Sequence, residues 1–163
     1  MFDFEDQFYY INIEDIAQWE VSIQDLFIIA LQNLSTEEVE IVEHLFDSKF
    51  NVFTLLSGDY SASYTLLIDN CLKFSIGVYG IILAIPTKGT VFIHPIQNKD
   101  ILDLIPFLQP EVKKFYDEDP GNISLDYYWY YQGQFHLFGK EVQLDQEILI
   151  TLPTTLKQLF NES

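Results

Sequence analysis

The fold is decided by the stretch from Asn51 to Ile96, which reads NVFTLLSGDYSASYTLLIDNCLKFSIGVYGIILAIPTKGTVFIHPI. Apolar runs bounded by turn residues are typical of strands, and the segment after Gly58-Asp59 has helical spacing instead. Pro86 offers no N–H for strand pairing, so it ends one strand, and the turn after it starts a hairpin. The stretch therefore predicts four elements: a strand at 51–57, a helix at 60–73, and strands at 77–85 and 90–96.

The chain after Ile96 continues the same alternation. Asn98 is a good N-cap for a helix over 99–105, Pro106 should break that helix, and Pro110 suits the start of a second piece reaching Tyr116. Gln132-Gly133 then separates two apolar runs, 123–131 and 134–138, as a hairpin turn does. From 51 to 131 the order is strand, helix, strand, strand, helix, strand. This order predicts an α+β fold of split βαβ (ferredoxin-like) type, an antiparallel or mixed sheet with helices mainly on one face.

Both flanks add short elements to this core. Phe2 to Ile13 reads as an extended arm or a short strand, and Ile13 to Trp19 as one helical turn. Ser22 begins a better helix that reaches Leu34, since its side chain can accept from free N–H groups. Residues 37–46 (EEVEIVEHLF) fit an edge strand or a short helix, and alternation with acids favours the strand. We expect one domain in three parts: an acidic helical region 1–48, the core 50–138, and a C-terminal strand (141–152) and helix (153–160) within 139–163.

Charge is the strongest global signal. The chain has 163 residues with 25 acids, 8 lysines and no arginine, and its net charge is −17. Residues 1–48 hold 12 of the acids and no lysine, so −12 of the −17 lies in the first third. Such a surface repels phosphates, which argues against direct binding of nucleic acid or an anionic membrane. It would attract a basic protein partner, and it would also keep an aromatic-rich protein in solution.

The sequence indicates a cytoplasmic protein. Cys71 is the single cysteine, so no disulfide framework exists, and we expect it to be a buried structural thiol. The N-terminus MFDFEDQ lacks the basic and apolar pattern of a signal peptide. No apolar run approaches the 18 or so residues of a membrane span. Composition gives no prediction of the oligomeric state.

The residues give no support to an enzyme, a metal site or a cofactor site. His44, His94 and His136 are far apart in the sequence and lack the spaced partners of a zinc site. No Gly-x-Ser-x-Gly elbow and no Gly-rich phosphate loop occurs. Asp117, Glu118 and Asp119 lack the alternating ligands and closing Glu of a calcium loop. We therefore predict no catalytic, cofactor-binding or metal-binding residue.

Two surfaces are candidates for binding a partner. The first is the acid cluster Glu37, Glu38, Glu40 and Glu43, which could equally be a solvated face. The second is the run 127–131 (YYWYY), in which alternate side chains point to opposite faces of a strand. If one face is core, Tyr128 and Tyr130 lie on the other, either displayed as a recognition surface or covered by the C-terminal extension.

A second pattern runs through the core: LLSGDYSAS at 55–63 leads into an apolar helix, and IILAIP at 81–86, a small turn and Val91-Phe92-Ile93 follow. In these residues the chain resembles the YtpQ-like family of bacterial domains of unknown function. The resemblance covers roughly residues 22–138, and the N-terminal region and the extension after Phe138 depart from it. It implies a cytoplasmic bacterial domain with no established activity and no catalytic residues to transfer.

The sequence thus favours a non-enzymatic protein-binding or regulatory domain. A bacterial immunity protein that neutralises a basic toxin is the alternative, because an acidic inhibitor is complementary to a basic nucleic-acid-cleaving toxin.

Overall fold

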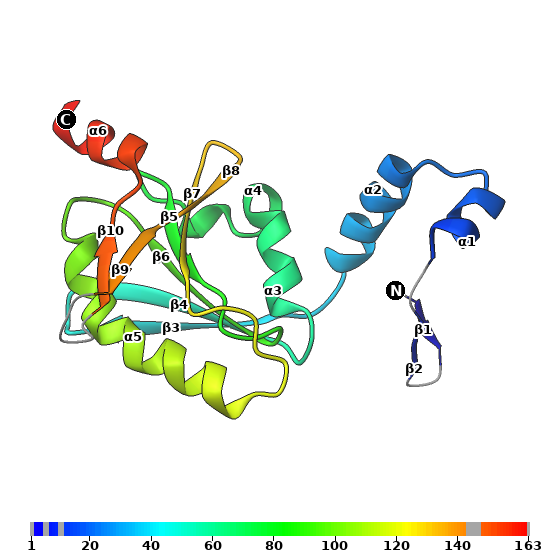
Figure 1. The fold of residues 1–163 in the computed structure, drawn as a ribbon, viewed down its shortest axis with the longest axis horizontal. Coiled ribbons are helices and arrows are strands. Elements are labelled where there is room, and N and C mark those ends of the chain that lie inside the picture. Colours follow the sequence, from blue (N-terminus) through cyan, green and yellow to red (C-terminus); the bar gives the residue numbers. More distant parts are fainter. Residues whose placement is uncertain (1, 5–6, 10–11, 143–147, 163) are drawn as a thin grey trace. The chain divides into compact units, whose positions relative to one another are not determined.

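The computed structural model describes residues 2–4, 7–9, 12–142 and 148–162, which form two compact units, Met1–Thr36 and Glu37–Ser163 (Figure 1). The predicted N-terminal region extended to Ser48. The second unit starts earlier than this, at Glu37, because residues 40–46 already form a strand of the main sheet.

The first unit holds a small hairpin and two helices. Its strands β1 (Phe2–Phe4) and β2 (Gln7–Tyr9) are antiparallel, so the N-terminal segment is a strand pair and not an extended arm. Helix α1 (Ile13–Gln18) follows, and then α2 (Ile23–Leu34). Ser22 caps α2 as predicted, since its Oγ accepts from the N–H of Asp25 at 3.1 Å.

The second unit is built on a fully antiparallel six-stranded sheet. In spatial order its strands are β3 (Glu40–Phe46), β4 (Phe50–Leu56), β6 (Thr90–Pro95), β5 (Ile81–Ala84), β7 (Tyr127–Tyr131) and β8 (Gln134–Leu137). Residues 40–46 are a strand, which confirms the favoured interpretation of that segment. The hairpins β5–β6 and β7–β8 are also confirmed. Gln132 and Gly133 both have positive φ, 49° and 79°, as a two-residue hairpin turn requires.

Helices cover both faces of this sheet, not mainly one as predicted. On one face, a first core contains Trp129 of β7 together with α5 (Ile101–Glu118) and α6 (Thr154–Glu162). On the other, a second core contains Leu83 of β5 and buried residues of the helical segment after β4. That segment consists of short pieces: α3 (Ser61–Tyr64), the 3-10 turn η1 (Thr65–Leu67), α4 (Ile68–Cys71) and the 3-10 turn η2 (Lys73–Ser75).

The unit is an α+β fold, but the ferredoxin-like order is not confirmed. In that order the fourth strand of the pattern lies beside the first, whereas here β7 lies beside β5, and β3 takes the place next to β4. The connection from β4 to β5 passes over β6, and the connection from β6 to β7 passes over β5 in the same direction along the sheet. Each connection joins two parallel strands, but β4 and β5 point opposite to β6 and β7. Because such connections are right-handed, their helices fall on opposite faces.

Helix α5 is continuous, although Pro106 and Pro110 were expected to divide it. Each proline removes one N–H from the helix ladder. Both lie on the exposed side of the helix, where water can bond the carbonyls that lose their partner. The buried side carries Leu104, Leu108 and Val112 into the first core, and this packing holds the helix together.

The C-terminal extension forms a second small sheet and a helix. Strands β9 (Gly139–Val142) and β10 (Ile148–Thr151) pair antiparallel, and α6 follows. The strand predicted over 141–152 is therefore two strands, and residues 143–147 of it lie outside the described part of the chain. The predicted C-terminal helix is confirmed.

Candidate functional site

Four exposed carboxylates mark one border of the main sheet. Glu40 and Glu43 belong to β3, and Glu37 and Glu38 immediately precede it; we call these four residues the acidic edge. Within the described part of the chain β3 pairs with β4 alone, so its other side has no strand partner there (Figure 1). The four acids that the sequence had singled out therefore all lie, exposed, on this border strand or just before it, with Glu40 and Glu43 on opposite faces of the sheet.

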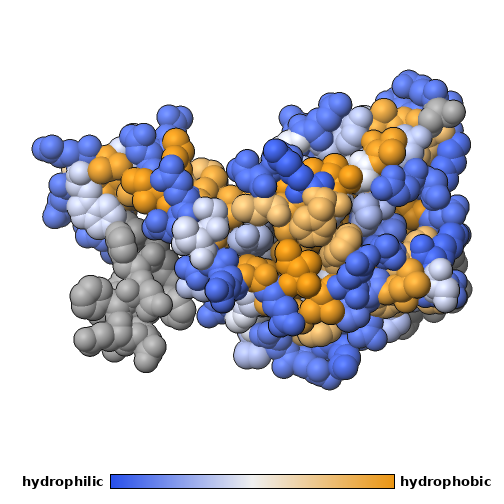
Figure 2. All heavy atoms as spheres, turned by 180° about the vertical axis from the view of Figure 1, so that it is seen from behind, coloured by the Kyte–Doolittle hydropathy of each residue, from blue (hydrophilic) through white to orange (hydrophobic). Residues whose placement is uncertain are grey.

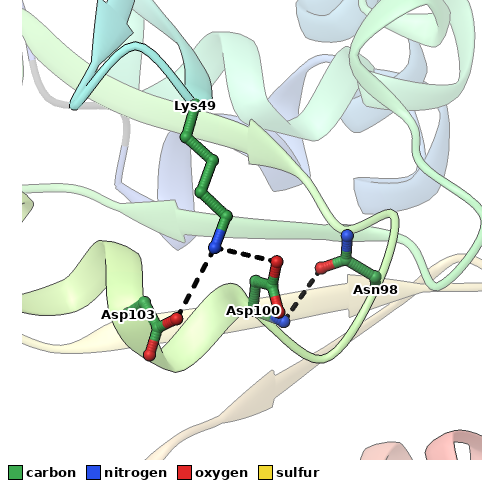
Figure 3. A network of polar contacts seen from close by, with 4 residues as sticks. All are labelled: Lys49, Asn98, Asp100 and Asp103. Carbon is green, nitrogen blue, oxygen red and sulfur yellow. Dashed lines mark hydrogen bonds and ion pairs between the residues drawn. The ribbon is translucent and has the colours of Figure 1, made fainter.

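The charge of the acidic edge is not neutralised within the described residues. Lys49, in the turn after β3, is the lysine nearest to it along the chain. Its Nζ instead lies 2.8 Å from a carboxylate oxygen of Asp100 and 3.6 Å from one of Asp103, at the start of α5 (Figure 3). The hydrogen bond with Asp100 raises the pKa of Lys49. In residues 12–139 and 149–162, no ion pair involves any member of the acidic edge.

Apolar side chains alternate with these acids along β3. Ile41, Glu43 and Leu45 share the sheet face of the second core, opposite Leu55, Phe53 and Asn51 of β4 respectively. Ile41 is 36% exposed and Leu45 is 60% exposed. Figure 2 shows that hydrophobic residues lie among hydrophilic ones on one face of the molecule. Sequence reasoning missed these two residues as part of the site. The alternation in EEVEIVEHLF was the signal that could have identified them.

The aromatic strand β7 (Tyr127–Tyr131) does not expose Tyr128 and Tyr130 as a recognition surface. Tyr130 is only 6% exposed and is a member of the second core, and Tyr128 is half-buried against the same core. The Tyr130 hydroxyl donates to a carboxylate oxygen of Asp69 on α4 at 2.5 Å. Burial, and then this hydrogen bond, raise the pKa of Tyr130 to about 12. The prediction that Tyr130 contacts a partner is therefore corrected, because its side chain is used inside the fold.

The face of Tyr128 and Tyr130 is covered, but not by the C-terminal extension that the covered alternative named. Leu156 and Phe160 of α6 pack in the first core, on the face of Trp129. Trp129 donates from Nε1 to the carbonyl of Tyr79 at 2.7 Å, and the Tyr79 ring packs edge-to-face on Phe160. The second face is closed instead by the segment α3 to η2.

A hollow without acidic or lysine side chains lies at the end of the β7–β8 hairpin. It has a volume of about 300 Å³ and is lined by Trp129, Tyr131, Gln132, Gln134, His136 and Thr155. The rings of Trp129 and Tyr131 stack 5.1 Å apart, and the ring of His136, which is paired with Trp129 across the hairpin, lies 5.0 Å from the Trp129 ring. These ring contacts account for the aromatic residues of this hollow as packing between strand neighbours.

The histidines and the cysteine have separate structural surroundings. His44, His94 and His136 lie on three different strands, β3, β6 and β8. Burial lowers the pKa of His94, and its Nδ1 hydrogen bond with the carbonyl of Asn51, 2.7 Å long, opposes that effect. Cys71 is half-buried, whereas a buried thiol was expected. Burial of the Tyr64 side chain, and then its hydrogen bond with Cys71, raise the pKa of Tyr64. Within the described residues no group of His, Cys, Asp or Glu is arranged to hold a metal ion.

Comparisons with known proteins give no relative for this chain: no family model, no curated protein and no solved structure matches it. None of the helices in the described part of the chain combines the length and apolar character needed to cross a membrane.

Proposed function

We propose that this protein is a non-enzymatic protein-binding or regulatory domain of the cytoplasm, and that its acidic edge binds a basic protein partner. The observation that supports the proposal is the set of four exposed carboxylates without ion pairs in residues 12–139 and 149–162, located on β3 or just before it, where the outer edge has no partner among the described strands. Unpaired like charges raise the free energy of the folded chain, and a cationic partner lowers it. The proposed resemblance to the YtpQ-like family is compatible with such a role.

A binding role is favoured over catalysis by the positions of the groups with shifted pKa values. Perturbed titrating groups gather at catalytic sites. Here Tyr130 bonds Asp69 across the second core, Tyr127 bonds Gln109 on α5, and His94 bonds the backbone of Asn51. Each of these three groups joins two elements of the fold. The other described groups with a shifted pKa also have structural partners: Tyr64 bonds Cys71 on α4, and Lys49 pairs with Asp100 at the start of α5.

The proposal is tested by charge replacement with a matched control. The variant E37Q/E38Q/E40Q/E43Q and the control E14Q/E20Q/E118Q/E162Q each remove four exposed charges, so both change the net charge from −17 to −13. A partner purified with the wild-type chain should lose most of its affinity for the first variant and keep it for the control. The affinity should also fall with added salt. If both variants bind equally well, the acidic edge is not the binding surface.

A narrower form of the proposal is a bacterial immunity protein, favoured by the net charge of −17. A toxin that cleaves nucleic acid carries a basic active-site surface, which an acidic inhibitor can cover. A reading frame for a secreted toxin beside this gene would support it. The direct test is co-expression: the wild-type chain should protect cells from that toxin, whereas the variant of the acidic edge should not.

A further inference from the structure

We propose that the partner of the acidic edge binds by strand addition: a basic, β-forming segment pairs with the open side of β3 and becomes a seventh strand of the main sheet. This inference rests on the proposed function and specifies the chemistry of its partner. It follows from the backbone of β3 and from the order of side chains along it.

The backbone of β3 offers a ready edge. All seven residues of β3, from Glu40 to Phe46, are paired in register with β4. In an antiparallel ladder about half of the N–H and C=O groups of a border strand point away from its neighbour. No other strand in the described part of the chain takes up those groups. An extended peptide can bond them, as it does wherever a sheet edge receives a segment.

The side chains of β3 define what that segment carries. On the face of the second core, Glu43 stands between Ile41 and Leu45, all three exposed. On the other face Glu40 is exposed at the start of the strand. Directly opposed residues on neighbouring strands interact, so an incoming strand is stabilised by cations opposite Glu40 and Glu43 and by apolar residues opposite Ile41 and Leu45.

The same charges explain why the edge accepts a basic strand and rejects its own copies. Two β3 strands pairing with each other would bring carboxylates of both copies together, which is unfavourable for like charges on opposed strands. A basic segment reverses the sign of that interaction. The acids therefore act on specificity as well as affinity.

The side-chain order of β3 yields a defined probe peptide. Written antiparallel to β3, from the position opposite Phe46 to that opposite Glu40, the sequence TVTKTVK places its lysines opposite Glu43 and Glu40 and its valines opposite Leu45 and Ile41. The control peptide TKTVTKV has the same composition and charge, but its lysines face the apolar residues. Both are used with capped ends against the full chain at low salt.

We expect TVTKTVK to bind about fivefold more tightly than TKTVTKV, which corresponds to about 1 kcal/mol. We expect E40Q/E43Q to lower its affinity by a similar factor, and E14Q/E20Q to leave it unchanged. In the complex, amide hydrogen exchange read by NMR should slow at outward-facing positions of β3. These positions report backbone pairing, which a merely electrostatic contact would not protect.

Three results would overturn strand addition. The two peptides could bind equally well, the β3 amides could exchange at the same rate with and without peptide, or neither peptide could bind. If both peptides bind equally well and E40Q/E43Q weakens both, strand addition is excluded, but the acidic edge remains an electrostatic binding surface. The proposed function itself is tested separately, by comparing how the purified partner binds E37Q/E38Q/E40Q/E43Q and the control E14Q/E20Q/E118Q/E162Q.

Discussion

The Tyr130 hydroxyl and the Asp69 carboxylate form a hydrogen bond that joins the aromatic strand β7 to helix α4. Tyr130 is buried and Asp69 is exposed, so the bond lies at the margin of the second core. It holds together two parts of the chain that are 61 residues apart in sequence.

Removing this bond should destabilise the protein modestly. A hydrogen bond to a charged group contributes more than a neutral one, but the exposure of Asp69 reduces that advantage, so we expect about 1 kcal/mol for Y130F. D69N should lower the unfolding free energy by less, because the amide oxygen of asparagine can still accept the hydrogen bond from the Tyr130 hydroxyl. Urea unfolding of Y130F, D69A and the double variant measures the coupling. A coupling energy near zero would show that the bond does not contribute to stability.

The raised pKa of Tyr130 predicts an alkaline transition. The folded state favours the neutral phenol and shifts its pKa from 10.0 to about 12. The stabilisation is therefore fully present below pH 10 and is lost as the pH rises toward 12. Unfolding free energies measured across this range should fall more steeply for the wild-type chain than for Y130F, which shares every other tyrosine. Parallel curves for the two proteins would contradict the assignment.

Because the sheet has a separate core on each face, we expect truncation of a buried side chain in either core to destabilise the second unit. Leu72 of the helical segment lies in the second core and Leu156 of α6 in the first, and both are fully buried. L72A and L156A should each lower the unfolding free energy by about 2–5 kcal/mol. L137A is the control, since Leu137 is 58% exposed, and it should cost less than about 0.5 kcal/mol. Thermal or urea unfolding distinguishes these outcomes. An L156A variant as stable as L137A would mean that α6 does not close the first core.

Local chemistry was predictable wherever one or two residues decide the structure. Ser22 at the start of α2 and Gln132-Gly133 in the β7–β8 turn are such positions, as is Pro86 after β5. Their effects depend on neighbours in sequence, so periodicity and turn chemistry suffice.

The cover over each sheet face was not predictable from the same signals. The run YYWYY is apolar on both faces, so alternation cannot tell which helix covers Tyr130. Helix continuity through Pro106 and Pro110 depends on packing of α5 against distant strands. Strand order likewise depends on which side of the sheet the chain crosses to after β6. For the candidate site, the acids were visible in the sequence, and the open side of β3 required the structure.

The acids of β3 should also keep the isolated protein from associating with itself. Ile41 and Leu45 are exposed beside an open backbone edge, which is the combination that promotes edge-to-edge pairing. Replacing Glu40 and Glu43 by valine removes the repulsion and raises strand propensity, so E40V/E43V should associate at concentrations where the wild-type chain does not. The control E118V/E162V adds the same apolar groups at exposed positions of helices α5 and α6, which have no open strand edge. Sedimentation velocity at low and high salt measures the outcome. Equal association of both variants would show that added hydrophobicity alone, and not the edge of β3, controls self-pairing.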